Sequence, residues 1–119
     1  MKAFALMASD TLIGSIGLTL TPQHHRGQLG YWIGVAYWNR GYATEAARAV
    51  VAYGFDELEL HRIWAPHFAS NPASGRVLQK LGMKYEGQQR EHYLRFGRYQ
   101  NAENYGMLRR DYEVQRQVG

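Results

Sequence analysis

The feature that most constrains the fold is a stretch, residues 29–46, that changes from strand-like to helix-like around a turn. Tyr31, Trp32 and Ile33 are of types enriched in strands, whereas Asn39 and Gly41 are of types that tolerate the backbone angles of turns. The sequence predicts a strand over 29–36 and a helix over 42–58, because apolar residues then recur at helical spacing. This apolar stripe consists of Ala43, Ala46, Ala47, Val50, Val51, Phe55 and Leu58.

The same stretch carries a possible anion site. A helix that starts after a small-residue turn has unpaired backbone N–H groups at its positive end, and these groups attract anions. Gly41 has no side chain, so a phosphate can approach the backbone closely, whereas Glu45 suits the helix dipole without helping to bind an anion. Two interpretations stay open: a phosphate or carboxylate site, or an ordinary strand-to-helix turn.

Length and composition restrict the class of protein. A chain of 119 residues with 45% hydrophobic and 20% charged residues is typical of one globular domain, here residues 1–119. It has no apolar run of the roughly 20 residues needed to span a membrane, and no signal peptide. Without cysteine it has neither disulfides nor thiolate metal sites. We expect a cytoplasmic, metal-free protein with no membrane partner.

The net charge of +4 lies entirely in residues 76–119, which hold nine basic and five acidic side chains. A basic region can serve nucleic acid or an anionic ligand. Here the arginines are dispersed among Glu and Asp rather than clustered, so we expect no nucleic-acid partner.

Before the strand at 29–36 the chain alternates in strand fashion. Residues 3–8 and 11–20 predict a β-hairpin with Ser9 and Asp10 in its turn. The polar loop Thr21–Gly27 follows, with adjacent histidines at 24 and 25. We expect both histidines to be solvated, because no nearby carboxylate completes a metal site.

After the helix, residues 61–69 predict a second strand, parallel to the first. Pro66 lies within it and has no N–H to donate, which indicates that this strand is not fully paired at that point. The objection disappears if the two parallel strands diverge there.

A second motif starts at Asn71. Asn71 is a good N-cap, Pro72 a good first helical residue, and Gly82 a good helix stop. Val77, Leu78 and Leu81 form the apolar stripe. The remaining chain predicts strands over 84–87, 88–96 and 99–108 with a turn at Gly97 and Arg98, and then a polar tail over 110–119 that frays.

Two segments carry a resemblance to a known family. Residues 38–46, Trp-Asn-Arg-Gly-Tyr-Ala-Thr-Glu-Ala, resemble the acetyl-CoA pyrophosphate loop of the GCN5-related N-acetyltransferases, usually Gln/Arg-x-x-Gly-x-Gly/Ala. Residues 71–83 resemble its second signature, Asn-x-x-Ser and then a short helix that ends in Leu-Gly-Phe. The chain is most similar to the branch that contains ribosomal-protein N-terminal acetyltransferases. Trp38, Asn39, Met83 and Asn101 depart from the family pattern.

The resemblance implies an α/β (α+β) fold. We expect a mixed, mostly antiparallel twisted sheet with a central pair of diverging parallel strands and two main helices. The chain starts at what would be the family's second strand, so the usual first strand and two helices are missing from it. The first strand then becomes an exposed sheet edge that can pair with another chain. A truncated product and a minimal form that completes itself as a homodimer both stay open.

The resemblance also implies acetyl-CoA as the acetyl donor and assigns residues to it. The backbone of Trp38, Asn39, Arg40, Gly41, Tyr42 and Ala43 would hold the pyrophosphate. The peptide groups of Ile33, Gly34 and Val35 would pair with the pantetheine amides, and a neighbouring N–H would stabilise the oxyanion. Arg76 would reach a CoA phosphate, although a solvated helical arginine explains it equally well.

For the chemistry, the resemblance assigns Asn71 to the cofactor arm and Ser74 to protonation of the leaving thiolate. Many relatives use a tyrosine four residues after that serine, where this chain has Leu78. In the simpler interpretation Asn71 and Ser74 only cap the helix. His67 is a candidate general base because imidazole titrates near neutral pH, but an ordinary half-buried histidine also fits. Its rivals are Glu86, Glu91, His92 and Tyr93.

Three functions follow, in decreasing order of support. The first is an acetyl-CoA-dependent N-acetyltransferase that acts on a small-molecule or peptide amine, including a protein N-terminus. The second is a catalytically silent acetyl-CoA-binding module or subunit. The third is a small basic nucleic-acid-binding protein. This function does not explain the second motif at residues 71–83.

Overall fold

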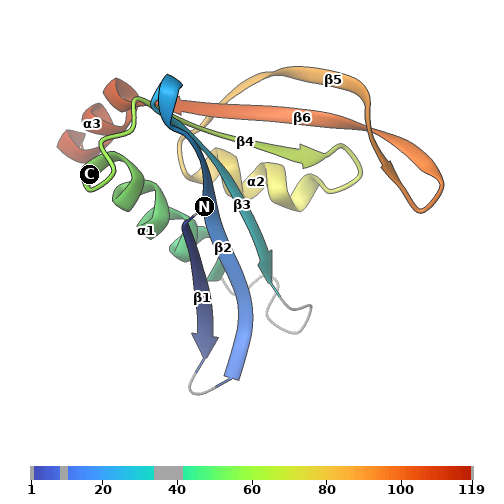
Figure 1. Cartoon of the computed structure of the whole chain (residues 1–119), viewed down its shortest axis with the longest axis horizontal. Helices are drawn as coiled ribbons and strands as arrows, with labels where there is room; N and C mark the ends of the chain where they lie inside the picture. The colour runs from blue at the N-terminus through green and yellow to red at the C-terminus, as the bar shows by residue number, and fades with distance from the viewer. Residues whose placement is uncertain (1, 9–10, 34–41, 119) are drawn as a thin grey trace.

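The computed structural model describes residues 2–8, 11–33 and 42–118. They form a six-stranded sheet with the strand order β1-β2-β3-β4-β6-β5 (Figure 1). Only β3 and β4 pair in parallel. The elements in chain order are β1 (Lys2–Ala8), β2 (Thr11–Thr21), the 3-10 turn η1 (Pro22–His24), β3 (Arg26–Ile33), α1 (Tyr42–Asp56), β4 (Arg62–Phe68), α2 (Pro72–Lys80), β5 (Lys84–Arg95), β6 (Arg98–Leu108) and α3 (Arg109–Val118).

The sequence-based fold class is confirmed. The N-terminal hairpin forms β1 and β2, and its turn residues Ser9 and Asp10 lie outside the described residues. The predicted helix over 42–58 ends at Asp56, and the predicted strand over 61–69 spans Arg62–Phe68. Strands that alternate with helices in this order produce the parallel pairing of β3 with β4.

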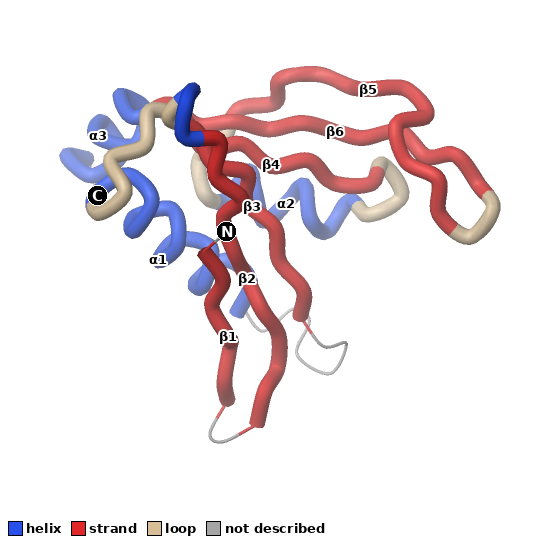
Figure 2. Tube along the Cα trace, viewed as in Figure 1, coloured by secondary structure: helices blue, strands red, loops and turns tan. Residues whose placement is uncertain are grey.

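The predicted divergence of the two parallel strands is also present. β3 and β4 pair at three positions only, the last of which joins Gln28 to Trp64. Beyond that point the sheet opens into two groups of strands, β1-β2-β3 and β4-β6-β5, which spread apart from a common corner (Figures 1 and 2).

Proline fits this arrangement because of strand alternation. Arg62 donates its N–H to the carbonyl of His25, on the β3 side, whereas Ala69 donates to Asn101 of β6. Peptide groups alternate in direction along a strand, so Pro66 shares the direction of Arg62. The missing N–H of Pro66 therefore faces the side on which β4 has left β3, and no ladder bond is lost.

The hydrophobic core lies between one face of the sheet and helices α1 and α2. Phe55 of α1, Leu18 of β2 and Ile63 of β4 are completely buried there. Gly54 allows α1 to approach the sheet, since a Cβ at this position would lie 2.8 Å from Cδ1 of Ile63. Leu78 of α2 closes the core on the other side. This packing fixes where each helix starts relative to the diverging strands.

The prediction of a frayed tail over 110–119 is wrong for the described residues. Residues 109–118 form α3, which packs on the end of α1 (Figure 1). The rings of Tyr112 and Phe55 stack with centroids 4.9 Å apart, and Gln115 Nε2 donates to the carbonyl of Leu81 over 2.9 Å. The sequence predicts a tail here because the segment is polar. The contacts that hold α3 in place are to Phe55 and Leu81, far away in the sequence.

The last two strands form a long hairpin whose tip extends away from the rest of the sheet (Figure 2). The turn lies at Phe96 and Gly97, one residue before the predicted position, and both have positive φ (53° and 72°). Phe96 is 88% exposed. None of the helices in the described part of the chain is long and apolar enough to cross a membrane.

Candidate functional site

The candidate site lies where β3 and β4 separate. The carbonyl of His25 bonds to the start of β4, so by strand alternation the peptide groups of Leu29, Tyr31 and Ile33 face the same side. The register of β3 with β4 ends at Gln28. The N–H of Leu29 still belongs to that last pair, so within the described residues the peptide groups of Tyr31 and Ile33 have no strand partner toward β4 and are available to an extended ligand.

Asn71 begins α2 directly after β4. Its N–H donates to the carbonyl of Phe68 (2.9 Å), and its Oδ1 accepts the N–H of Ser74 (3.4 Å). The N-cap prediction is confirmed, and the side chain is exposed. The cap uses Oδ1, whereas the amide Nδ2 donates to no residue that the structure describes and is available to a ligand.

Ser74 occupies the first turn of the same helix and is half-buried. Its N–H also lies 3.2 Å from the carbonyl of Asn71, but its hydroxyl makes no hydrogen bond to any residue that the structure describes. Leu78, one turn later, is 1% exposed and belongs to the core. Of these two positions, only Ser74 carries a hydroxyl that can donate a proton.

His67 lies on the face of β4 that the helices cover, in alternation with the buried Ile63 and Ala65. Its Nδ1 is 2.7 Å from the carbonyl of Phe68, and its ring stacks on Tyr105 with centroids 5.7 Å apart. A Cβ at Gly75 would lie 2.9 Å from its Nε2. The imidazole is therefore held between β6 and the first turn of α2.

The residues predicted to hold the pyrophosphate are only partly described. Residues 34–41, which include Gly34, Val35, Trp38, Asn39, Arg40 and Gly41, lie outside the described residues. Ile33 is the last residue of β3, and Tyr42 and Ala43 open α1. Arg76 is exposed on α2 and pairs with none of the residues that the structure describes. The site thus joins the end of β3 to the starts of two helices.

The rival general bases lie elsewhere on the sheet. Glu86 is bound by Arg62 through two hydrogen bonds of 2.7 and 2.5 Å, and the guanidinium holds the pKa of Glu86 below its usual value. Such a carboxylate is a poor base. Burial raises the pKa of the Tyr93 hydroxyl. Glu91 and His92 are exposed on β5. These four residues are not brought together with Asn71 and Ser74 by any contact in the described structure.

Sequence reasoning missed three participants. The Phe68 carbonyl accepts from both Asn71 and His67, and a backbone acceptor leaves no trace in residue type. Gly75 could have been noticed, because a glycine inside a short helix indicates a close approach. Tyr105, which packs on His67 and accepts a bond from Gln79 over 3.1 Å, belongs to a distant strand.

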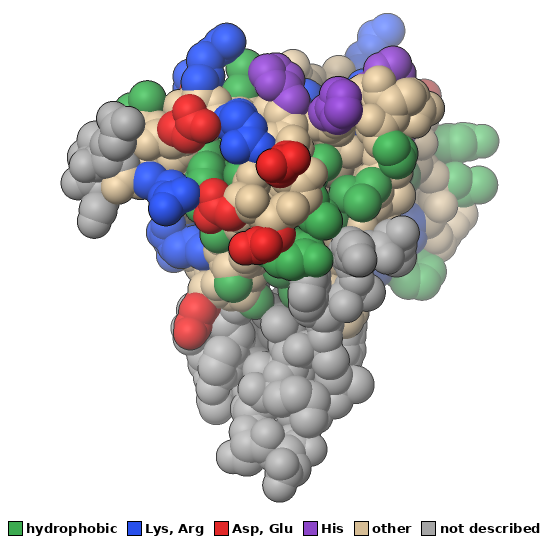
Figure 3. Space-filling model, turned by 60° about the vertical axis from the view of Figure 1, so that its left-hand side comes forward, with side chains coloured by type: hydrophobic (Ala, Val, Ile, Leu, Met, Phe, Trp, Pro, Cys, Tyr) green, Lys and Arg blue, Asp and Glu red, His purple; other side chains and the backbone are tan. Residues whose placement is uncertain are grey.

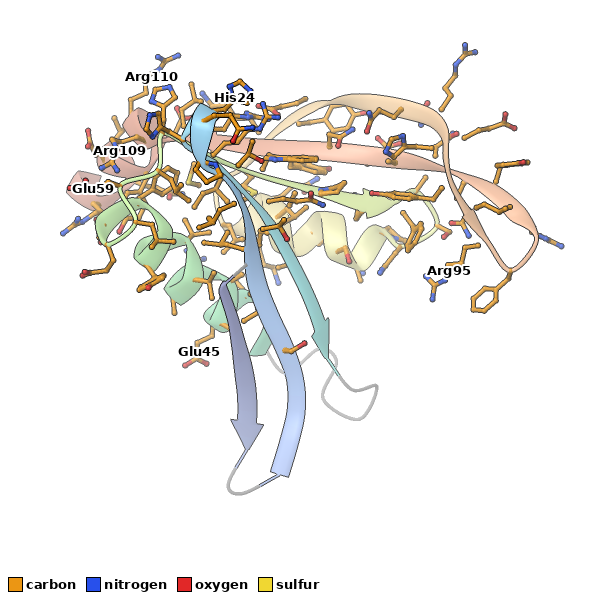
Figure 4. All side chains as sticks on the ribbon, in the orientation of Figure 1. His24, Glu45, Glu59, Arg95, Arg109 and Arg110 are labelled. Atoms are coloured by element: carbon orange, nitrogen blue, oxygen red, sulfur yellow. The ribbon has the colours of Figure 1, made fainter. Side chains whose placement is uncertain are left out.

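Figure 4 shows several charged residues that lie away from this site. His24, Arg109 and Arg110 lie at the corner where β3 and β4 are still paired, and Arg95 lies at the far hairpin tip. Figure 3 shows the histidine side chains of this face grouped at the top of the view, with basic and acidic side chains mixed beside them. Among the described residues, no three of His, Asp and Glu are grouped so as to hold a metal ion.

Comparisons with known proteins agree with this geometry. Residues 1–84 match the acetyltransferase (GNAT) domain family. The chain is 42% identical to the uncharacterized N-acetyltransferase YoaA of Bacillus subtilis over 79% of its length and 51% of the relative's. It is 30% identical to a putative ribosomal N-acetyltransferase of the same species, YdaF, over 91% of this chain and 60% of that one.

A solved structure shares the fold as well. A GNAT-family acetyltransferase from Bacillus anthracis superposes with a TM-score of 0.82 and 33% identity, and the match covers 92% of this chain and 67% of that one. The chain spans about half the length of the first curated relatives that it matches. The profile match over most of the sequence, together with the diverging parallel strands, shows that the chain belongs to the acetyltransferase (GNAT) family.

Proposed function

We propose that the chain transfers an acetyl group from acetyl-CoA to a primary amine. The observation that carries this proposal is the early separation of β3 from β4, with the capped start of α2 following the end of β4. It leaves unpaired peptide groups on β3, on one side of the opening, and Asn71 and Ser74 after the strand on the other side. Membership of the GNAT family supports acetyl-CoA as the donor. The activity is proposed for the protein as a whole, since the chain spans about half of its relatives.

The proposed seat of acetyl-CoA follows the divergence. The pantetheine arm pairs with the peptide groups of β3 at Ile33 and then at Gly34 and Val35. The pyrophosphate binds the backbone of residues 38–43, where the start of α1 adds the positive end of its dipole. Arg76, exposed on α2, contributes to binding a CoA phosphate. The peptide direction at Ile33 supports the first of these contacts.

The reaction needs few groups from the protein. The neutral amine nitrogen attacks the thioester carbonyl carbon, the C–N bond forms and the C–S bond breaks. Ser74 gives its hydroxyl proton to the departing thiolate, the amine loses one proton to a base, and Ser74 regains a proton from that base or from solvent. Asn71 holds the cofactor arm. Binding energy on the distant nucleotide positions the thioester for attack.

For the acceptor we propose a peptide N-terminal amine, in the manner of the ribosomal-protein branch. The relative named as a ribosomal N-acetyltransferase, which matches over 91% of this chain, supports this choice. A small aliphatic amine is the alternative within the same reaction. Both acceptors are primary amines and need the same thioester geometry, so they differ only in what surrounds the amine.

A turnover screen tests this proposal. Acetyl-CoA is incubated with the protein and with N-terminal peptides, diamines or polyamines, and free CoA is followed with a thiol reagent. We expect release of CoA that depends on the amine. The Ser74→Ala variant should bind acetyl-CoA as before and turn over more slowly, because water must supply the proton. Unchanged turnover in this variant would remove the serine from the mechanism.

The pyrophosphate assignment has a separate test. Gly41→Asp should abolish acetyl-CoA binding in calorimetry, because it places bulk and negative charge against the diphosphate. Glu45→Gln is the matched control, since it changes charge in the same helix turn without touching the proposed loop. Undiminished affinity in the Gly41 variant would contradict the assignment.

The second candidate is an acetyl-CoA-binding module without catalysis. Both candidates predict that acetyl-CoA raises the melting temperature. Only the enzyme releases CoA when an amine is added, so the same screen separates the two.

We also propose a homodimer formed through β1. This strand ends the sheet on one side and pairs with β2 only within the described residues. An unpaired strand edge offers N–H and C=O groups to a second copy. Sedimentation velocity should give the mass of a dimer, and a monomer at all concentrations would refute this assembly.

A further inference from the structure

We propose that His67 is a positioning residue for the acetyl transfer and does not act as the general base. It holds the turn that carries Asn71 and Ser74, through the carbonyl of Phe68. This inference rests on the proposed function, because Asn71 and Ser74 matter here as the groups that meet the cofactor. It changes the role that the sequence motif suggested for the histidine.

The Phe68 carbonyl is the centre of the arrangement. It accepts the N–H of Asn71 over 2.9 Å and lies 2.7 Å from Nδ1 of His67. A carbonyl oxygen can only accept, so Nδ1 must carry a proton. By strand alternation this carbonyl points away from β6. It therefore accepts no hydrogen bond from the β6 ladder. The imidazole and the cap residue thus share one acceptor, and both of its lone pairs are used.

The other side of the ring contacts the helix. Gly75, the residue after Ser74, is buried, and a Cβ there would lie 2.9 Å from Nε2 and 3.4 Å from Cε1 of His67. The ring of Tyr105, only 7% exposed, stacks on the imidazole from β6 at an interplanar angle of 23°. The histidine therefore supports the turn at both ends, Nδ1 at Phe68 and Nε2 at Gly75, with Asn71 and Ser74 between them.

The position of His67 argues against a role as the general base. Because Nδ1 already donates to Phe68, Nε2 is the nitrogen left to accept a proton. Nε2 lies against the position of Gly75, under the first turn of α2. An amine that approached Nε2 from this side would meet the helix that carries Ser74. The geometry suits a group that holds the turn in place.

Two substitutions of similar size separate the roles. His67→Asn keeps an N–H donor near the position of Nδ1, whereas His67→Gln moves the amide toward the position of Nε2 and leaves Phe68 without its second donor. We expect the Asn variant to keep kcat within about threefold. We expect the Gln variant to lose kcat on the order of 10- to 100-fold, as misplaced catalytic groups do.

The pH dependence of turnover separates a positioning residue from a general base. A catalytic imidazole would give the wild-type protein an acidic limb in its pH–rate profile, and both variants would lose that limb together with most of the activity. We expect the Asn variant to keep the wild-type profile. Equal loss in both variants, or wild-type kcat in the Gln variant, would overturn the inference.

A measurement without turnover keeps this test apart from the proposed function. Long-range proton–nitrogen NMR spectra of the free protein at pH 8 should show His67 with the proton on Nδ1, and the Nε2-protonated tautomer would refute the arrangement. If the wild-type protein binds acetyl-CoA but turns over no amine, the proposed function fails while this result still stands.

Discussion

At the scale of single residues, two glycines make room for functional or charged side chains. Gly75 lets the start of α2 lie on His67. Gly106 of β6 lies under the Glu86 carboxylate, which crosses β6 to reach Arg62 of β4. A Cβ at Gly106 would lie within 2.5 Å of Oε1 of Glu86. Neither glycine has a positive φ, so the space that each leaves explains its presence.

Gly106→Ala should cost about 1 kcal/mol of unfolding free energy or less, because the added methyl group displaces Glu86 from Arg62 and this ion pair is partly exposed. In a Glu86→Ala background the clash is absent, and alanine should be neutral or stabilising in the strand. Urea titrations of the two single variants and the double variant check this reversal of sign. Additive effects would contradict it.

The same ion pair predicts a pH dependence. Arg62 lowers the pKa of Glu86 below its ordinary 4.5, chiefly through their hydrogen bonds. A lowered folded-state pKa stabilises the fold above the unfolded-state value, and this contribution is lost as the pH falls through the folded-state value. Glu86→Gln should therefore be less stable than wild type at pH 7 but not well below pH 4. A difference that persists in acid would refute this assignment.

At the scale of elements, α3 completes the core from the outside. Tyr112 stacks on Phe55 and donates to Asp56 over 2.8 Å, and Arg116 binds the same carboxylate over 3.0 Å. Arg109 Nη2 donates to the carbonyl of Phe55 over 2.7 Å. These contacts supply hydrogen-bond donors to the last turn of α1, so α3 stabilises the helix whose other end starts the proposed pyrophosphate site.

Tyr112→Ala should destabilise the protein by about 2 kcal/mol, because it removes a half-buried ring from the core. Tyr112→Phe removes only the hydroxyl bond to Asp56 and should cost about 1 kcal/mol or less. The matched control is Val114→Ala on the same helix, where the side chain is 60% exposed. Thermal unfolding ranks the three, and equal effects would mean that α3 does not pack on α1.

At the scale of the whole molecule, the sheet has two halves joined by a short parallel contact. Figure 1 shows that the halves spread apart beyond this contact, and the molecule extends 42 by 38 by 27 Å. The two strands stay apart for a local reason and a global one. Pro66 offers no donor to a neighbour, and the helices pack differently on the two halves, α1 chiefly on β2 and β3 and α2 on β4.

Hydrogen exchange should report this opening directly. The amides of Gly30 and Trp32 face β2 and should exchange slowly, whereas those of Tyr31 and Ile33 face the divergence and should exchange fast. Acetyl-CoA should slow exchange at Ile33 selectively if its pantetheine arm pairs there. Uniform protection along β3 in the free protein would contradict the open arrangement.

Much of the fold was predictable because it depends on local signals. The hairpin of β1 and β2, the helix from Tyr42 and the cap at Asn71 follow from alternation, helical period and capping chemistry. Pro66 even indicated the divergence, since a missing donor matters only beside a paired strand. The candidate site was predictable to the same extent: Asn71 and Ser74 could be placed on one helix start from their spacing.

The sequence alone determined the order of elements as far as β6, the capped start of α2 and the family, because each depends on neighbours along the chain. Only the tertiary structure decided the rest. In the tertiary structure Glu86 forms an ion pair with Arg62, α3 packs on Phe55, and His67 lies between Tyr105 and Gly75. These contacts join residues distant in sequence, and a side chain's type does not specify which distant partner it will meet.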